Sequence, residues 1–599
     1  MLKNKILVAS VLAAVTTMGL VACGSSSRNP DPVTISLIGM NDFHGNLLPP
    51  SGSVTVKDPA NAAGTKVSAG GIAYLTSLIK ELKAQNPGNT LVVGAGDLIG
   101  ATPITSALFH DEPTVDALGQ MGLDITSVGN HEFDKGRDEL LRMQNGGCFP
   151  KTADGSRGNI GVDTCMTDGK FAGAKFKFLA ANVIDQKTGS TLFAPYEIRS
   201  VGGVNIGFIG LTLKDTPSVV TPAGVAGFTF NDEVETVNRL IPELKSKGAM
   251  SIVVLIHQGG TTTATTVNDK TCPGISGDIV NLTDKFDPAV DVVISGHTHQ
   301  EYNCTRPDGK LLTQTGFYGR VVSKIDITID TMQKKVLSKS ANNIVAINDV
   351  GVKDAAGALI PLPAGMKAQP KDAAMAALVQ RYVDLSAPIN NSVIGTLAAP
   401  LTRTQNSAGE SKMGDLVGDI YLAGSSGPAY GNKAAQIAFS NVGGIRTDLT
   451  TSLQVTFGQL FAVMPFGNNL TTMDLTGAQI LRLLEQQWEA PQPAGGRVMQ
   501  VSNGFSYTWD GSKPAGAAAG TGNRVVADSM KLNGTPIDLS KTYRVTVNNF
   551  MSTGGDNFTV LKSGTNVQQG DVDIDAGAAY FRKFGTVPEP AQNRISRIN

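Results

Sequence analysis

Short runs rich in valine, isoleucine and leucine recur through the first half of the chain, and each run ends in a polar turn that contains glycine. Apolar runs of this length, bounded by turn residues, are typical of buried β-strands. The predicted strands are Val33–Met40, Thr90–Gly94, Ile125–Val128, Phe176–Ala180, Val204–Ile209, Met250–Ile256 and Val290–Ile294. Helical patterns lie between several of them, at Gly71–Gln85, Thr114–Met121 and Asp232–Lys247. This alternation predicts a layered α/β domain.

A second domain is expected after a boundary rich in proline and glycine. The chain has 599 residues, enough for two to four globular units of about 150 residues each. We assign residues 33–345 to the first domain and 346–390 to a linker with a connecting helix near Asp372–Ser386. Residues 391–599 form the second, an α+β domain. Its expected helices and strands are Met413–Ala423, Thr476–Gln487, Gln436–Ser440 and Tyr543–Asn548.

The first residues are typical of an export signal. Lys3 and Lys5 precede an apolar run that extends from Ile6 to about Leu20, and Cys23 follows directly. This pattern predicts a signal peptide over residues 1–22. The Leu-Val-Ala-Cys ending resembles a bacterial lipobox, which implies a lipid on Cys23 and a flexible tether over residues 23–32. We therefore expect a monomeric lipoprotein in the bacterial cell envelope, anchored in the outer membrane and facing the periplasm or the cell surface.

Disulfides are expected in that oxidising compartment. If Cys23 carries lipid, the other four of the five cysteines form an even set, for which three pairings exist. We favour Cys148–Cys165 and Cys272–Cys304, because each of these pairs closes a short loop that is polar or rich in glycine.

The overall charge argues against a nucleic acid polymer as a partner. The chain carries 50 basic and 51 acidic residues, so its net charge is −1 and it has no basic excess for a phosphate backbone. Hydrophobic residues make up 41% of the chain and charged residues 17%, which are values typical of globular proteins.

Histidines and carboxylates collect where the predicted strands end. The chain has 6 histidines, and only His110 lies away from these strand ends. Mixed oxygen and imidazole donors suit Zn, Mn or Fe ions, and a shared carboxylate can hold two ions together. The residues at the strand ends are Asp42, His44, Asp97, Asn130, His131, His257, His297 and His299.

The order of these motifs resembles the dinuclear metallophosphoesterase superfamily. Three motifs in the second domain resemble the 5′-nucleotidase, UDP-sugar hydrolase and 2′,3′-cyclic phosphodiesterase family: Ser440–Arg446, Pro465–Gly467 and Asn549–Phe558. The resemblance covers roughly Val33 to Asn599. It implies an N-terminal α/β metallophosphoesterase sandwich and a C-terminal α+β domain that binds the substrate.

The resemblance also implies a role for each matching residue. Two divalent metal ions, Zn, Mn or similar, would be held by Asp42, His44, Asp97, Asn130, His257, His297 and His299, with Asp97 bridging them. His131 and Asp134 match the catalytic pair and are not expected to bind metal. Phe466 and Phe550 match the pair that stacks on the nucleobase. Asn441 and Arg446 match residues that contact the base and the phosphates, and Asp556 matches the residue that binds the ribose hydroxyls.

Two positions depart from the family pattern. Many nucleotidases have Gln or Asn where this chain has His299, and an Arg usually lies closer to Glu410 than Arg403 does. Arg403 is therefore a candidate contact to phosphate or base.

The expected function is metal-dependent hydrolysis of phosphate esters of extracytoplasmic nucleotides, for salvage of nucleoside and phosphate. Three alternatives remain open: a 2′,3′-cyclic nucleotide phosphodiesterase with 3′-nucleotidase activity, a UDP-sugar or dinucleotide pyrophosphatase, and a surface-binding lipoprotein without catalysis.

Overall fold

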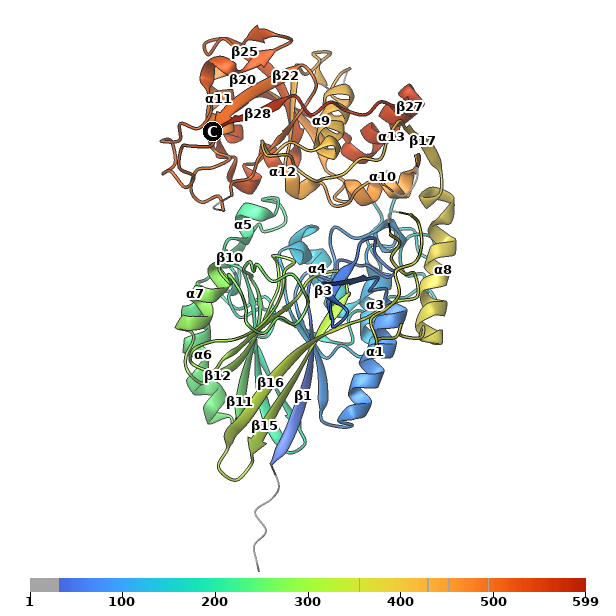
Figure 1. Ribbon diagram of the computed structural model, residues 1–599, viewed down its shortest axis with the longest axis vertical. Coiled ribbons are helices and arrows are strands. Elements are labelled where there is room, and N and C mark those ends of the chain that lie inside the picture. Colours follow the sequence, from blue (N-terminus) through green and yellow to red (C-terminus); the bar gives the residue numbers. More distant parts are fainter. Residues whose placement is uncertain (1–31, 154, 355, 428–429, 451–452, 494) are drawn as a thin grey trace, which may run out of the picture.

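The computed structural model describes residues 32–599, apart from 154, 355, 428–429, 451–452 and 494. The predicted signal peptide, Cys23 and nearly all of the tether lie outside the described residues. The chain folds into two halves that lie one above the other in Figure 1, with the N-terminal half below. Within the described part of the chain, no helix is long and apolar enough to cross a membrane.

The N-terminal half contains two six-stranded sheets. The first has the strand order β16-β15-β1-β4-β5-β6, and β1, β4, β5 and β6 are parallel. The second has the order β13-β14-β12-β11-β9-β8, with β9, β11, β12 and β14 parallel. The strands of the first sheet are β1 (Val33–Met40), β4 (Thr90–Ala95), β5 (Ile125–Ser127), β6 (Lys177–Leu179), β15 (Val321–Asp330) and β16 (Lys335–Val345). Those of the second are β8 (Tyr196–Val201), β9 (Val204–Thr212), β11 (Ser251–His257), β12 (Val290–Ser295), β13 (Glu301–Thr305) and β14 (Leu311–Thr315).

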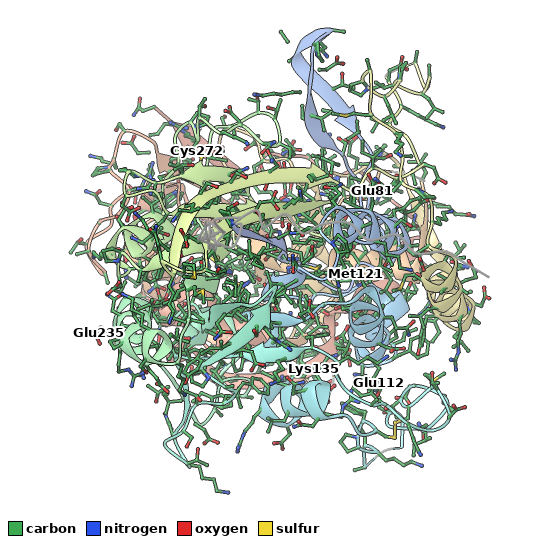
Figure 2. The ribbon with its side chains drawn as sticks, turned by 90° about the horizontal axis from the view of Figure 1, so that it is seen from below. Glu81, Glu112, Met121, Lys135, Glu235 and Cys272 are labelled. Carbon is green, nitrogen blue, oxygen red and sulfur yellow. A yellow bond between two sulfur atoms is a disulfide. The ribbon has the colours of Figure 1, made fainter. Side chains whose placement is uncertain are left out.

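The two sheets pack face to face between two layers of helices. Leu37 and Val93 of the first sheet share a buried cluster with Phe208 and Val253 of the second. Figure 2 shows the helix that bears Met121 and the helix that bears Glu235 on opposite sides of the sheets. The larger helices are α1 (Ile72–Gln85), α3 (Glu112–Met121), α4 (Gly136–Asn145), α6 (Glu233–Ser246) and α7 (Asp278–Lys285). Because β1 is covered on both faces, its residues from Ile35 onward are buried.

Short elements complete this half. The hairpin of β2 (Val54–Asp58) and β3 (Asn61–Val67) is antiparallel, as is the pair β7 (Val183–Asp185) and β10 (Phe228–Phe230). The remaining short helices are α2 (Ile104–Ala107), η1 (His131–Phe133) and α5 (Thr216–Val219).

A single long helix leads into the C-terminal half. This helix, α8 (Ala373–Asn390), begins at Asp372, whose side chain accepts a hydrogen bond from the Met375 N–H. It contacts α1, α2 and α3 of the N-terminal half and α10 of the C-terminal half. In Figure 1, α8 runs along one side of the molecule from the lower half toward the upper.

The C-terminal half mixes small sheets with helices. A five-stranded sheet has the order β21-β18-β25-β20-β26, and the other two have the orders β19-β17-β27 and β24-β23-β22-β28. Their strands are β17 (Val393–Leu397), β18 (Ile437–Ser440), β19 (Gln454–Thr456), β20 (Asn469–Thr476), β21 (Gln500–Val501), β22 (Phe505–Asp510), β23 (Lys531–Leu532), β24 (Thr535–Pro536), β25 (Thr542–Asn548), β26 (Thr565–Val572), β27 (Thr586–Val587) and β28 (Ile595–Ile598). The helices are α9 (Lys412–Gly424), α10 (Phe457–Val463), α11 (Gly477–Glu485), α12 (Asn549–Ser552) and α13 (Asp573–Phe584), with 3-10 turns η3 (Val442–Gly444), η4 (Ala527–Ser529), η5 (Gly555–Asn557) and η6 (Thr559–Ser563).

The layered α/β fold followed by an α+β half is confirmed. Thr456 and Thr476 each begin a helix with a capping box, so the local sequence determines where α10 and α11 start. Both favoured disulfides are present, Cys148–Cys165 and Cys272–Cys304.

Candidate functional site

The predicted metal ligands meet at one edge of the paired sheets. Strands β1, β4 and β5 lie side by side in the first sheet, and β11 and β12 lie side by side in the second. Their carboxyl ends meet because the strands are parallel and the sheets are stacked. The turns that follow β1, β4, β5, β11 and β12 contain Asn41–Gly45, Gly96–Asp97, Gly129–Asp134, Gln258–Gly259 and Gly296–His299, and His257 is the last residue of β11.

Three groups of side chains there could each hold a metal ion, and two of them consist only of predicted ligands. The first contains Asp42, His44 and His299, whose ligand atoms lie within 4.8 Å of one another. In it, His299 Nε2 lies 3.2 Å from Asp42 Oδ1 and 3.1 Å from His44 Nε2.

The second group contains Asp97, His257 and His297. Here His257 Nε2 lies 3.0 Å from Asp97 Oδ2, and Asn130 Oδ1 lies 3.0 Å from His297 Nδ1. Asp97 also lies 3.7 Å from His44 Nε2 of the first group, so its carboxylate stands between the two.

The hydrogen bonds of the buried histidines fit a cation at this place. His44 Nδ1 lies 2.8 Å from the Gly100 carbonyl, and His257 Nδ1 lies 2.7 Å from the Ala95 carbonyl. A carbonyl can only accept, so each Nδ1 carries the hydrogen, and in the neutral ring each Nε2 turns a lone pair toward the carboxylates. His257 Nε2 is buried without a hydrogen-bond partner. Lone pairs that face carboxylates are unfavourable unless a positive ion lies between them, so this donor set fits divalent metals.

The pKa values of His44 and His257 also fit a cation at this place. Burial lowers the pKa of His44 to about 4, so its ring is neutral and able to bind a metal. Burial also opposes charge on His257, but the neighbouring Asp97 carboxylate outweighs it and raises the pKa of His257 to about 10. The carboxylate therefore draws a positive charge to the position that a metal ion would take.

His131 and Asp134 form a hydrogen-bonded pair beside the predicted metal ligands. His131 Nδ1 lies 2.8 Å from Asp134 Oδ2, and the His131 backbone N–H donates to Asp97 Oδ1 at 2.9 Å. Burial opposes charge on His131, yet Asp134 and Asp97 outweigh it, so its pKa is raised. The ring atoms of His131 also lie within 4.8 Å of ligand atoms of His44 and Asp97, so distance alone does not separate a ligand from a catalytic group.

Two predicted substrate residues reach this site from the C-terminal half. The ring of Phe466 stacks on that of His131, with centroids 5.6 Å apart and planes at 22°. Arg446 Cζ lies 5.8 Å from the Phe466 ring centroid, and Arg446 Nη2 is buried without a partner.

Three other predicted residues form a second cluster in the C-terminal half. Asn441 Nδ2 donates to Asp556 Oδ2 at 2.8 Å, and Asn441 Oδ1 accepts from Asn548 Nδ2 at 3.0 Å. Phe550 packs against the hydrophobic core of this half and lies against Gly555. The contacts of Phe466 and Phe550 thus differ, since the Phe466 ring stacks on a residue of the N-terminal half.

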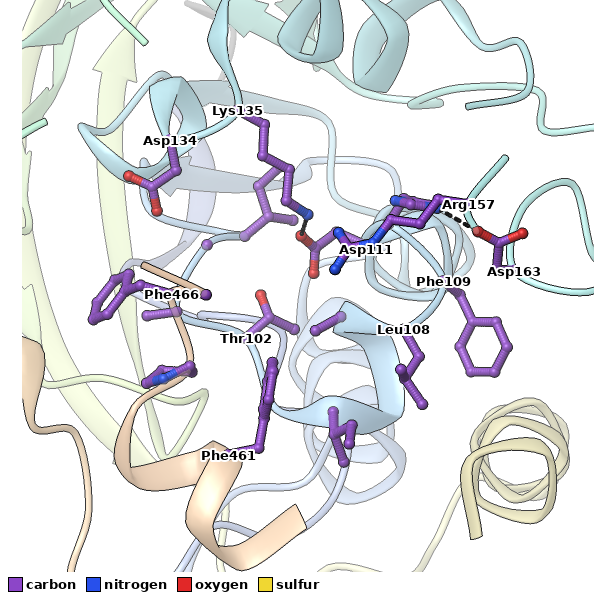
Figure 3. Close-up of a pocket in the computed structure, with 18 of the residues that line it drawn as sticks. Thr102, Leu108, Phe109, Asp111, Asp134, Lys135, Arg157, Asp163, Phe461 and Phe466 are labelled. Atoms are coloured by element: carbon purple, nitrogen blue, oxygen red, sulfur yellow. Dashed lines mark hydrogen bonds and ion pairs between the residues drawn. The ribbon is translucent and has the colours of Figure 1, made fainter. Parts of the chain in front are cut away.

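Arg403 lines a different cavity from the one beside His131. Its Nε lies 3.3 Å from Asp448 Oδ1, and both residues line a cavity of about 440 Å³ together with Ser411 and Ile445. A larger cavity of about 630 Å³ lies beside the predicted catalytic pair, where Phe461 and Phe466 of one half face Thr102 and Lys135 of the other (Figure 3).

Sequence reasoning missed three neighbours of the predicted site residues. Phe317 stacks on His299 with centroids 4.8 Å apart, and Arg320 lies over Phe317. Arg497 pairs with Asp556. The turn Gly495–Gly496 before Arg497 is the one local signal, because such turns often bear binding residues.

Comparison with known proteins agrees with this architecture. Residues 35–301 match the family model described as calcineurin-like phosphoesterase, and residues 393–563 match the one described as 5′-nucleotidase, C-terminal domain. The chain is 31% identical over 599 residues to cell wall protein Lmo0130 of Listeria monocytogenes, covering 96% of this chain and 70% of that protein.

Two further relatives extend the comparison. Endonuclease YhcR of Bacillus subtilis is 32% identical over 94% of this chain, but the chain spans only 41% of that protein. The crystal structure of a 5′-nucleotidase precursor from Thermus thermophilus superposes with a TM-score of 0.69 at 27% identity, covering 95% of this chain and all of that one. The chain therefore belongs to the 5′-nucleotidase family of calcineurin-like phosphoesterases, metal-dependent phosphoester hydrolases that use two divalent ions.

Proposed function

We propose that this protein removes phosphate from extracytoplasmic nucleotides, of which 5′-monophosphates are the preferred class. The observation that carries the proposal is the stack of Phe466 on His131, with Arg446 beside it. The aromatic ring of Phe466 and the guanidinium of Arg446, both from the C-terminal half, lie beside the proposed metal ligands of the N-terminal half. A nucleotide offers a base to the aromatic face and a phosphate to the guanidinium.

In this proposal, the two metal ions are held by Asp42, His44, Asp97, Asn130, His257, His297 and His299. Bound there, they supply Lewis-acid activation of water and neutralise the phosphoryl oxygens. The protein's own groups act on the leaving side. His131 holds a proton near the leaving oxygen, and Asp134, through its hydrogen bond to Nδ1, orients the ring and favours its charged form.

The C-terminal half is proposed to bind the nucleoside. Phe466 and Phe550 stack on the base, and Asp556 accepts from the ribose hydroxyls. Asn441 is held against Asp556, which supports a joint role in one polar subsite. Arg446 has a buried nitrogen without a partner, which supports a contact to phosphate oxygen. Arg403 is proposed as an outer contact to phosphate or base, since its side chain is half-exposed and lines a different cavity from the one beside His131.

An extracytoplasmic location is supported by several observations. Two disulfides are present in the described residues, and disulfides persist in oxidising compartments. One relative is named a cell wall protein. Export through the signal at residues 1–22, a lipid on Cys23 and a monomeric state remain part of the proposal.

A substrate panel tests the proposal. Phosphate release from AMP, 3′-AMP, 2′,3′-cyclic AMP, UDP-glucose and NAD is measured with the purified chain in added Mn²⁺ or Zn²⁺. We expect the highest kcat/KM with AMP. Preference for the cyclic nucleotide or for UDP-glucose or NAD would select one of the alternative hydrolases. Absence of hydrolysis by a protein that has bound both metals would favour a binding lipoprotein.

A further inference from the structure

Glu132 is a buried carboxylate beside the metal ligands, and none of the roles above uses it. Its residue is 3% exposed. Its Oε2 accepts the backbone N–H groups of Gly129 at 2.6 Å and Asp97 at 2.9 Å, and its Oε1 accepts that of Leu98 at 2.7 Å. The Ile99 N–H lies 3.4 Å from the same Oε1.

These donors belong to two separate loops. Asp97 and Leu98 follow strand β4, whereas Gly129 follows β5. The first loop supplies the proposed bridging carboxylate, and the second supplies Asn130 and His131. One side chain therefore binds the backbone of both loops at the positions where their metal-ligating residues begin.

The loops also approach each other unusually closely. A Cβ on Gly129 would lie 2.1 Å from Asp97 Oδ1, and a Cβ on Gly96 would lie 2.6 Å from the Gly129 nitrogen. Both positions require glycine for this reason. The backbone amides that this packing buries need acceptors, and a carboxylate with four lone pairs can satisfy several of them at once.

We propose that Glu132 is a positioning residue that fixes the spacing between the Asp97 loop and the Asn130 loop before any metal binds. The inference rests on the proposed ligand roles of Asp97 and Asn130. A glutamine at this position would keep the shape but would turn an NH₂ group toward backbone N–H donors. The loops would then separate, although every ligand side chain would still be present.

Glu485 provides a matched control for a carboxylate that only stabilises the fold. It is also buried, with 5% exposure, and accepts the backbone N–H groups of Arg524 at 3.0 Å and Val525 at 2.7 Å. It lies on α11 in the C-terminal half, away from the proposed ligands.

The test compares Glu132→Gln with Glu485→Gln in the full chain. Hydrogen exchange of peptides that contain residues 94–100 and 127–133 is measured on the chelator-treated protein, and Mn²⁺ affinity is then measured by calorimetry. We expect Glu132→Gln to speed exchange in both peptides and to weaken Mn²⁺ binding by ~10–100-fold, the range found when residues that support metal ligands are lost. Glu485→Gln should lower the melting temperature but leave both measurements at the wild-type value.

Wild-type exchange and wild-type Mn²⁺ affinity in a folded Glu132→Gln protein would overturn the inference. If that variant does not fold, the same measurements on Glu132→Asp decide, because this variant keeps the charge but shortens the reach to both loops. Neither measurement depends on which substrate the protein cleaves, so failure of the nucleotidase proposal would be seen separately in the substrate panel.

Discussion

Phe466 stacks on His131, so an aromatic ring from the C-terminal half covers the imidazole proposed to act on the leaving group. The two residues are separated by hundreds of positions in the sequence and belong to different halves. Any substrate that uses both must lie between the halves. The predictions below follow from this shared site.

Asp97→Asn should abolish hydrolysis and reduce bound metal. Its carboxylate stands between the two ligand groups, 3.0 Å from His257 Nε2 and 3.7 Å from His44 Nε2. The neutral amide loses the charge that would hold both ions. Elemental analysis of the purified variant checks this, and two ions per chain with wild-type turnover would contradict the bridging role.

His131→Ala should lower kcat by ~10²–10⁴ while metal content stays at the wild-type value, because a positioned acid or base group contributes that much. The KM should change little. His110→Ala is the matched control, since His110 also pairs with an aspartate, Asp163, at 3.0 Å but lies outside the metal-ligand groups. Loss of metal from His131→Ala would instead make His131 a ligand.

Phe550→Ala should reduce kcat/KM for AMP by about one to two orders of magnitude, from the ~1–3 kcal/mol of a base–aromatic stack. The kcat/KM for p-nitrophenyl phosphate should be unchanged, because this substrate lacks a nucleobase. Phe466→Ala should weaken AMP hydrolysis similarly. Because Phe466 also contacts His131, the Phe550 variant gives the cleaner comparison. Equal losses on both substrates would mean that Phe550 belongs only to the core.

Arg446→Ala should weaken hydrolysis of AMP and p-nitrophenyl phosphate alike. A hydrogen bond to a charged group is worth ~1.5–3 kcal/mol, so a loss of ~10–100-fold in kcat/KM is expected for each. Arg403→Ala serves as the comparison, as Arg403 pairs with Asp448 and lines a separate cavity. A selective loss on AMP would assign Arg446 to the base and not to phosphate.

Replacing Cys148 and Cys165 by serine should destabilise the N-terminal half by ~2–4 kcal/mol, since the bond closes a loop with a sequence separation of 17. The same loop is tied to the domain by Glu112, which accepts the Cys165 N–H at 2.7 Å and pairs with Arg142. We therefore expect the loop that contains Cys165 to keep its position when the disulfide is removed. Denaturation followed with an active-site probe measures the shift, and an unchanged midpoint would contradict a stabilising role.

Strand positions could be predicted from sequence because their signals are local. The predicted bounds of β1 match the structure at both ends, since an apolar run there stops at a polar turn. The hairpin strand β3 was not predicted, because Asn61–Val67 lacks an alternating apolar pattern. Helix α8 was expected to end near Ser386 but continues through Pro388 to Asn390.

That the candidate ligands lie close together could also be predicted, because each follows a strand end. Contacts between side chains from distant loops could not. The stack of Phe317 on His299 and the pairing of Arg497 with Asp556 depend on how separate turns pack, and no spacing in the sequence records that packing.

Five proposed ligands share a backbone conformation that side chains other than glycine seldom adopt. Asp42, His44, Asp97, His297 and His299 all have positive φ, between 47° and 73°. Each such residue costs on the order of 1–3 kcal/mol and persists only because its surroundings enforce the conformation. The packing around these turns must therefore offset strain at five proposed ligand positions at once. A substitution that loosens this packing would release the strain by moving the proposed ligands, so it would disturb the site even where it touches no ligand side chain.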